Sequence, residues 1–119
     1  MNGREIILDI LLEVSGQKEY SNILITAVLD KYDYLDSREK AFIKRVSEGC
    51  IERRIQIDYV LNLYSKTPVH KMKPLIRELL RMSTYQLLFM EHVPDAAVCN
   101  EAVKLAKKRK FQALQGYVN

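Results

Sequence analysis

The spacing of apolar residues is the feature that most constrains the fold. They recur every three or four residues along nearly the whole chain, and no stretch alternates with period two for long enough to predict a strand. Gly16, Pro68, Pro74 and Pro94 interrupt this pattern and leave short connections between the segments. The sequence therefore predicts an all-α bundle.

The interruptions define about seven helices. The expected spans are residues 4–14, 22–32, 37–54, 56–65, 74–91 and 95–109, with a seventh helix suggested by Phe111, Leu114, Tyr117 and Val118. Ser21 is the expected N-cap of the second helix, Asp36 or Ser37 that of the third, and Pro74 and Pro94 suit the first turns of later helices.

Burial can be predicted from the same pattern. Residues 85–90 are apolar almost all round, so we expect helix 74–91 to be the most buried element, with Leu79 and Leu88 in the core. Gly49 lies on the apolar stripe of the third helix, where it predicts close contact with a neighbouring helix. Among the tyrosines, we expect Tyr59, Tyr64 and Tyr85 in the core, and Tyr20 and Tyr34 to be more open.

Composition fits a soluble globular protein. The 119 residues suit one domain and are 48% apolar and 29% charged. No apolar run approaches the ~20 residues needed to span a bilayer, and the N-terminus does not resemble a signal peptide, so we expect a cytoplasmic protein without membrane contact. Cys50 and Cys99 are expected to be two buried, unpaired thiols.

Charge is distributed unevenly along the chain. Residues 1–36 hold three cations and seven anions, net −4, whereas residues 37–119 have a net charge of +8. A basic region of this kind favours an anionic partner, with RNA as the first candidate. The alternative is that the cations only solvate helix surfaces.

The candidate RNA-binding residues are cations that cluster in the basic region. They are Arg38, Lys44, Arg45, Arg53, Arg54, Arg77, Arg81, Lys104, Lys107 and Lys108. The last three are spaced i, i+3 and i+4, which places them on one helix face, where they could follow RNA phosphates.

Signals for catalysis are missing. The sequence has no phosphate-binding glycine loop, no HExxH and no GxSxG. His70 and His92 are far apart in the chain, and neither cysteine belongs to a CxxC pair. We therefore predict no catalytic residue and no metal site.

Several short motifs occur in a characteristic order through the whole chain. They are Tyr20-Ser21-Asn22; Leu35-Asp36-Ser37-Arg38-Glu39-Lys40-Ala41-Phe42; Gly49-Cys50-Ile51-Glu52-Arg53-Arg54 with Ile57-Asp58; Leu79-Leu80-Arg81-Met82; Tyr85-Gln86-Leu87-Leu88; Val93-Pro94 with Ala97-Val98; Glu101-Ala102-Val103; and Gly116-Tyr117-Val118-Asn119. In this order and spacing, the chain resembles the NusB-like N-terminal domain of bacterial ribosomal RNA cytosine-C5 methyltransferases, in the NusB/RsmB family.

The resemblance implies two three-helix subdomains plus an extra helix, and a role in holding small-subunit ribosomal RNA. It also implies that residues 1–119 are a fragment that binds no cofactor. In such enzymes the S-adenosylmethionine site and the cysteine nucleophile lie in a separate C-terminal domain. That domain is a further expected partner of this chain. Ser83 stands where such domains commonly have glycine, so helix packing there should be looser. Lys110 stands where a helix-ending glycine is usual, so helix 95–109 should run longer or end irregularly.

A stand-alone NusB protein is the alternative within the same resemblance. Such a transcription antitermination factor binds RNA together with a ribosomal protein. Its arginine-rich N-terminus is reduced here to Arg4, which favours the methyltransferase domain.

Overall fold

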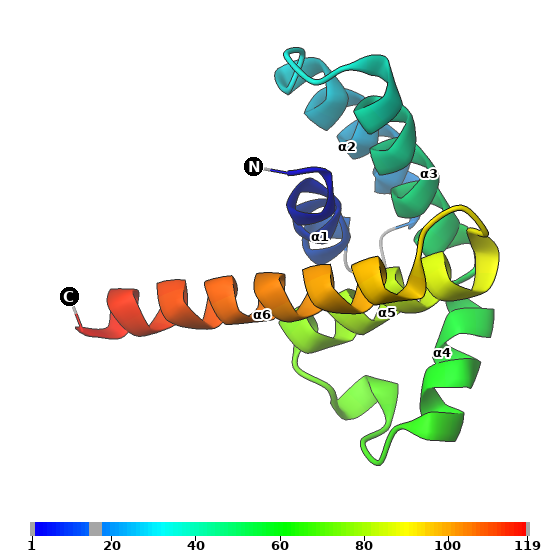
Figure 1. Ribbon diagram of the computed structural model, residues 1–119, viewed down its shortest axis with the longest axis vertical. Helices are drawn as coiled ribbons and strands as arrows, with labels where there is room; N and C mark the ends of the chain where they lie inside the picture. The colour runs from blue at the N-terminus through cyan, green and yellow to red at the C-terminus, as the bar shows by residue number, and fades with distance from the viewer. Residues whose placement is uncertain (1, 15–17, 119) are drawn as a thin grey trace.

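The computed structural model describes residues 2–14 and 18–118, and these residues form helices and connections without a strand. The elements are α1 (Gly3–Val14), α2 (Lys18–Lys31), α3 (Ser37–Glu52), α4 (Arg54–Tyr64), the 3₁₀ turn η1 (Val69–Lys71), α5 (Pro74–Phe89) and α6 (Asp95–Val118) (Figure 1). The prediction of an all-α bundle is confirmed.

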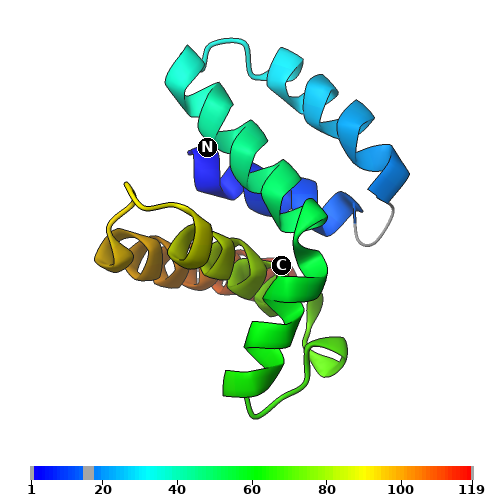
Figure 2. The same cartoon turned by 90° about the vertical axis from the view of Figure 1, so that its right-hand side faces the viewer.

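The helices form two groups that meet at α5. Helices α1, α2 and α3 all pack against one another, whereas α5 packs against both α4 and α6. Helices α1 and α3 of the first group also pack on α5, so α5 joins the two groups (Figures 1 and 2).

Local signals explain some helix ends. The Asp36 carboxylate accepts a hydrogen bond of 2.8 Å from the backbone N–H of Glu39, so Asp36 is the N-cap of α3. Helix α3 ends at Glu52, slightly earlier than predicted, because Arg53 adopts a non-helical conformation between α3 and α4. The predicted cap at Ser21 is wrong, because α2 already begins at Lys18 and Ser21 is buried within it.

Helix α6 runs without interruption from Asp95 to Val118, so the predicted seventh helix does not exist as a separate element. Lys110 occupies the position where a glycine would favour a helix end, and the helix continues through it. The prediction that Gly16 ends the first helix lies outside the described residues, as do the side chains of Phe111, Leu114, Tyr117 and Val118.

The core is centred on α1 instead of α5. Six apolar residues of α1 are buried, namely Ile6, Ile7, Leu8, Ile10, Leu11 and Val14, because α2, α3 and α5 all pack on this helix. Leu79 of α5 is buried as predicted, but Leu88 is 51% exposed. The second half of α5 turns Tyr85 and Gln86 inward, which leaves Leu87 and Leu88 on the outer face.

The tyrosines divide differently from the prediction. Tyr85 is buried, and Tyr20 and Tyr34 are exposed, as expected. Tyr59 and Tyr64 are exposed, so their assignment to the core is wrong. Helix α4 buries only Ile57; Tyr59, two positions later, lies on another side of the helix, and Tyr64 is the last residue of the helix.

Gly49 allows α3 and α5 to approach closely, as predicted. A Cβ atom at position 49 would overlap the ring of Tyr85. Neighbouring aromatic rings continue this contact, because the ring centroids of Tyr85 and Phe89 are 5.3 Å apart. The glycine therefore determines how closely the end of α5 lies against α3.

Among the residues that the structure describes, no helix combines the length and the apolar character needed to cross a membrane.

Candidate nucleic-acid interface

Two of the candidate arginines meet at the end of α5. Arg45 of α3 donates a hydrogen bond of 3.1 Å from Nη2 to the carbonyl oxygen of Phe89. The guanidinium carbon of Arg53, at the α3–α4 junction, lies 4.8 Å from the centroid of the Phe89 ring. Both arginines are exposed, so the contacts with Phe89 hold two cations at the surface.

The other candidate cations of α3, Arg38 and Lys44, are exposed on the same helix as Arg45. Within the described residues, no ion pair or hydrogen bond holds either side chain. They can therefore change conformation freely, in contrast to Arg45 and Arg53.

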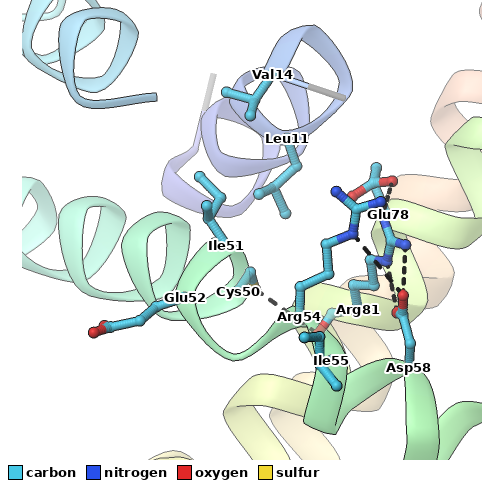
Figure 3. A pocket seen from close by; sticks show the side chains of 10 residues that line it. All are labelled: Leu11, Val14, Cys50, Ile51, Glu52, Arg54, Ile55, Asp58, Glu78 and Arg81. Carbon is cyan, nitrogen blue, oxygen red and sulfur yellow. Dashed lines mark hydrogen bonds and ion pairs between the residues drawn. The ribbon is translucent and has the colours of Figure 1, made fainter. Parts of the chain in front are cut away.

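Arg81 lies in the interior, where it joins α4 to α5. Its side chain is only 8% exposed. Nε and Nη2 donate to the two carboxylate oxygens of Asp58, each at 2.8 Å, and Nη1 donates to Glu78 Oε2 at 2.9 Å (Figure 3). Burial by itself would lower the pKa of Arg81, but its hydrogen bonds with Asp58 and the charge of Glu78 outweigh burial and raise the pKa.

This network removes Arg81 from the surface on which RNA could lie, although the sequence grouped it with the surface cations. Arg77 is also largely engaged, because its Nε lies 2.6 Å from Glu78 Oε2. Arg54 is more open, with Nε 4.0 Å from Asp58 Oδ2. We therefore assign Arg81 to the stability of the fold and leave it out of the candidate interface.

A cavity of about 500 Å³ opens beside this network (Figure 3). Its lining residues are Leu11, Val14, Cys50, Ile51, Glu52, Arg54, Ile55, Asp58, Glu78 and Arg81. The thiol is held in a weak hydrogen bond, with Cys50 Sγ 3.8 Å from the Arg81 carbonyl oxygen. Burial, with the charge of Glu78 adding to it, raises the pKa of Cys50 far above its ordinary range, which makes this thiol a poor nucleophile.

The cations of α6 fall into two sets. Lys104 is 75% exposed and lies 3.8 Å from Glu101, and Lys107 is also exposed. Lys108 instead pairs with the buried Glu5 of α1 at 2.7 Å. Because Lys108 is paired with Glu5, Lys104 and Lys107 are more available to a ligand than Lys108.

Arg109 adds a second connection between α6 and α1. Its Nη2 lies 2.7 Å from Asp9 Oδ1 and 3.3 Å from Glu5 Oε2. These pairs neutralise acidic groups of the N-terminal region with basic groups of α6. Helical spacing could not predict this pairing, because the partners are about a hundred positions apart in the chain.

Three further surface features were not predicted from the sequence. Phe89 was expected in the core but is half-buried and supports Arg53. Helix α4 exposes Ile55, Tyr59 and Leu63 at intervals of four residues, which places them along one side. Cys99 was expected to be buried but is exposed on α6. In each case the face that a helix buries depends on distant neighbours.

Within residues 2–14 and 18–118, no group of three or more His, Cys, Asp or Glu side chains is arranged to hold a metal ion. His70 and His92 are both exposed. The described surface does carry exposed cations on α3 and α6.

The comparisons with known proteins point to one family. The NusB family matches residues 1–119. A protein of Bacillus subtilis named "Probable ribosomal RNA small subunit methyltransferase B" is 33% identical over 116 residues, which cover 98% of this chain and 26% of that protein. Its counterpart in Synechocystis is 25% identical over the whole chain, again 26% of the relative. The chain thus spans about a quarter of the length of these relatives.

Other relatives are close to this chain in length. "Transcription antitermination protein NusB" of Clostridium novyi is 29% identical over 98% of this chain and 89% of the relative. The protein of the same name in Kineococcus radiotolerans is 36% identical over 91% of this chain and 81% of the relative. No solved structure matches the chain. With the family matched from the first residue to the last and the helices arranged as a bundle, this chain belongs to the NusB family.

Proposed function

We propose that this chain is the RNA-binding accessory domain of an S-adenosylmethionine-dependent ribosomal RNA cytosine-C5 methyltransferase. In this role it holds small-subunit ribosomal RNA in the cytoplasm while a separate domain performs the methyl transfer. The relative from Bacillus subtilis supports the assignment, since its similarity to this chain is confined to about a quarter of its own length.

The observation that carries the proposal is the distribution of cations over the surface. The acidic groups Glu5 and Asp9 are neutralised by Lys108 and Arg109. Other cations on α3 and α6 remain exposed, namely Arg38, Lys44, Arg45, Arg53, Lys104 and Lys107. Cations exposed in this way can displace the counterions that are condensed on RNA phosphates, which is the main source of sequence-independent affinity.

The proposal assigns no chemistry to this part of the protein. Its one buried thiol, Cys50, is kept protonated by burial. The methyl donor would bind in the separate domain, which would be the second partner of this chain besides RNA. Incubation of the chain with S-adenosylmethionine and small-subunit RNA should therefore transfer no methyl group.

A stand-alone antitermination factor is the second candidate. It is favoured by the relatives from Clostridium novyi and Kineococcus radiotolerans, whose lengths this chain nearly matches. In that case the chain would bind RNA together with a ribosomal protein, and no catalytic domain would be needed.

Titration of the purified chain with labelled RNA tests the proposal and separates the candidates. Three samples are compared: a small-subunit ribosomal RNA transcript, an unrelated transcript of equal length, and the unrelated transcript with a mixture of purified ribosomal proteins. Binding to the ribosomal transcript by the chain alone, without ribosomal proteins, is the expected result. Binding that occurs only when the ribosomal proteins are present would favour the antitermination factor, and the absence of RNA binding in all three samples would contradict both candidates.

A further inference from the structure

We propose that Arg45 and Arg53, held in place by Phe89, form a site for the phosphodiester backbone of RNA. The site lies where α3 meets the C-terminal end of α5. It deepens the proposed function, on which it rests, by naming the two side chains that are already arranged for a phosphate before RNA arrives.

The site is built from a series of contacts between α3 and α5. Gly49 leaves room for the ring of Tyr85 against α3. Tyr85 in turn lies 5.3 Å from Phe89, measured between ring centroids. Phe89 is thereby fixed at the end of α5, next to the surface of α3 that carries Arg45 and Arg53.

Phe89 holds the two arginines in different ways. Its backbone carbonyl accepts the hydrogen bond from Arg45, and its ring lies beneath the guanidinium of Arg53. Arg53 is fixed a second time, because its Nη1 donates to Gln56 Oε1 at 3.2 Å. The partial negative charge at the C-terminus of α5 explains why cations gather there.

Most of the donors of both arginines stay free for a ligand. A guanidinium group carries five N–H donors in a rigid fork that matches the oxygens of a phosphate. One N–H of Arg45 and one of Arg53 are used in the contacts described above. The guanidinium carbon of Arg53 lies 4.8 Å from the Phe89 ring centroid, and Gln56 is the one hydrogen-bond acceptor of its side chain among the described contacts.

Preorganisation distinguishes this site from the other exposed cations. Ordering a long side chain on binding costs roughly 0.5–1.5 kcal/mol, which corresponds to a factor of about two to ten in affinity. The contacts with Phe89 and Gln56 remove part of this cost for Arg45 and Arg53. Arg38 and Lys44 on the same helix have no such support among the described contacts. A phosphate should therefore bind more tightly to the supported pair.

The first test compares two double variants with equal loss of charge, using a short fluorescein-labelled oligouridylate in an anisotropy titration. Arg45→Ala/Arg53→Ala should lose roughly tenfold in affinity per arginine. The slope of log K against log salt should also fall by about 0.7 for each lost phosphate contact. The matched control, Arg38→Ala/Lys44→Ala, should lose clearly less. Equal losses in the two variants would overturn the proposal, because only net charge would then matter.

The second test examines the supporting role of Phe89. Phe89→Leu keeps the carbonyl acceptor and all charges but removes the ring, so affinity should fall by about threefold with an unchanged salt slope. Arg53→Lys keeps the charge but loses the fork and its stacking, and should weaken binding by a similar factor. Thermal melts show whether each variant is folded. If Phe89→Leu unfolds, Arg53→Lys decides, and wild-type affinity in that variant would overturn the site.

Failure of this inference differs from failure of the proposed function. If the wild-type chain binds no RNA, the proposed function is wrong. If the wild type binds RNA and the Arg45→Ala/Arg53→Ala variant binds equally well, only this site is wrong.

Discussion

The ring of Tyr85 fills the space that a side chain at Gly49 would occupy. This close contact lies between α3 and α5, the helices that connect the two groups of the bundle. The Tyr85 ring also packs beside the ring of Phe89 and so holds Phe89 at the surface where Arg45 and Arg53 lie. One glycine therefore affects both the packing of the core and the candidate RNA site.

Gly49→Ala should destabilise the fold. Alanine favours a helix over glycine by roughly 1 kcal/mol, but the added methyl group would overlap the Tyr85 ring, and such overpacking costs about 1–3 kcal/mol. We expect a net loss of free energy of unfolding in urea, followed by circular dichroism. Gly49→Ala/Tyr85→Leu, which makes room for the methyl group, should show a smaller penalty than the sum of its two single changes. An increase in stability for Gly49→Ala alone would contradict the described packing.

Arg81→Ala should reduce stability far more than it reduces RNA binding. The change removes the partner of Asp58 and Glu78, and the loss of one member of a buried ion pair costs about 3–5 kcal/mol. Arg38→Ala is the matched control, because Arg38 is exposed, and should change the free energy of unfolding by less than about 0.5 kcal/mol. Urea unfolding of both variants measures the difference. Similar stabilities for the two variants would show that Arg81 is not the connection that the structure describes.

The two cysteines should differ strongly in reactivity. Cys99 is exposed, whereas Cys50 is buried and its pKa is raised by burial and by Glu78. A chromogenic disulfide reagent should therefore modify Cys99 quickly and Cys50 only when the chain unfolds, with Cys99→Ser as the control that isolates Cys50. Rapid modification of Cys50 in the folded Cys99→Ser variant would contradict its burial.

The raised pKa of Cys50 also predicts a dependence of stability on pH. Because the folded-state pKa is above the unfolded one, the unfolded chain loses its thiol proton first as pH rises. The stabilising contribution is complete below the unfolded pKa, about 8.5, and is lost progressively above it. Cys50→Ala should weaken the fall in the free energy of unfolding above this pH. If the free energy of unfolding fell as steeply at alkaline pH in Cys50→Ala as in the wild type, the fall would be caused by other groups.

The sequence predicted local structure better than long-range contacts. Helical periodicity identified the bundle, and Asp36 marked the start of α3, since both depend on residues close together in the chain. The prediction that Leu88 is buried was wrong, because the exposed face of α5 depends on where α3 and α6 pack. A single helix α6 was also missed, since the spacing of apolar residues does not distinguish one long helix from two short ones.

The candidate site shows the same limit. Helical spacing correctly placed Lys104, Lys107 and Lys108 on one helix, but it could not reveal that Glu5 engages only Lys108 among them. The role of Phe89 could not be predicted from the sequence either, because it depends on contacts with Arg45 and Arg53, which lie more than thirty positions earlier in the chain.

The central claim is that the exposed cations of this NusB-family chain bind RNA phosphates, and the salt dependence of RNA affinity tests it most directly. Anisotropy titrations with a small-subunit ribosomal RNA transcript would compare the wild type, Lys104→Ala/Lys107→Ala and the charge-matched control Lys66→Ala/Lys71→Ala, whose lysines are also exposed. The wild type should bind with log K falling linearly against log salt. The α6 variant should bind more weakly, with a slope smaller by about 0.7–0.9 for each lost phosphate contact, while the control keeps the wild-type slope. Wild-type binding that is absent or independent of salt would contradict the account.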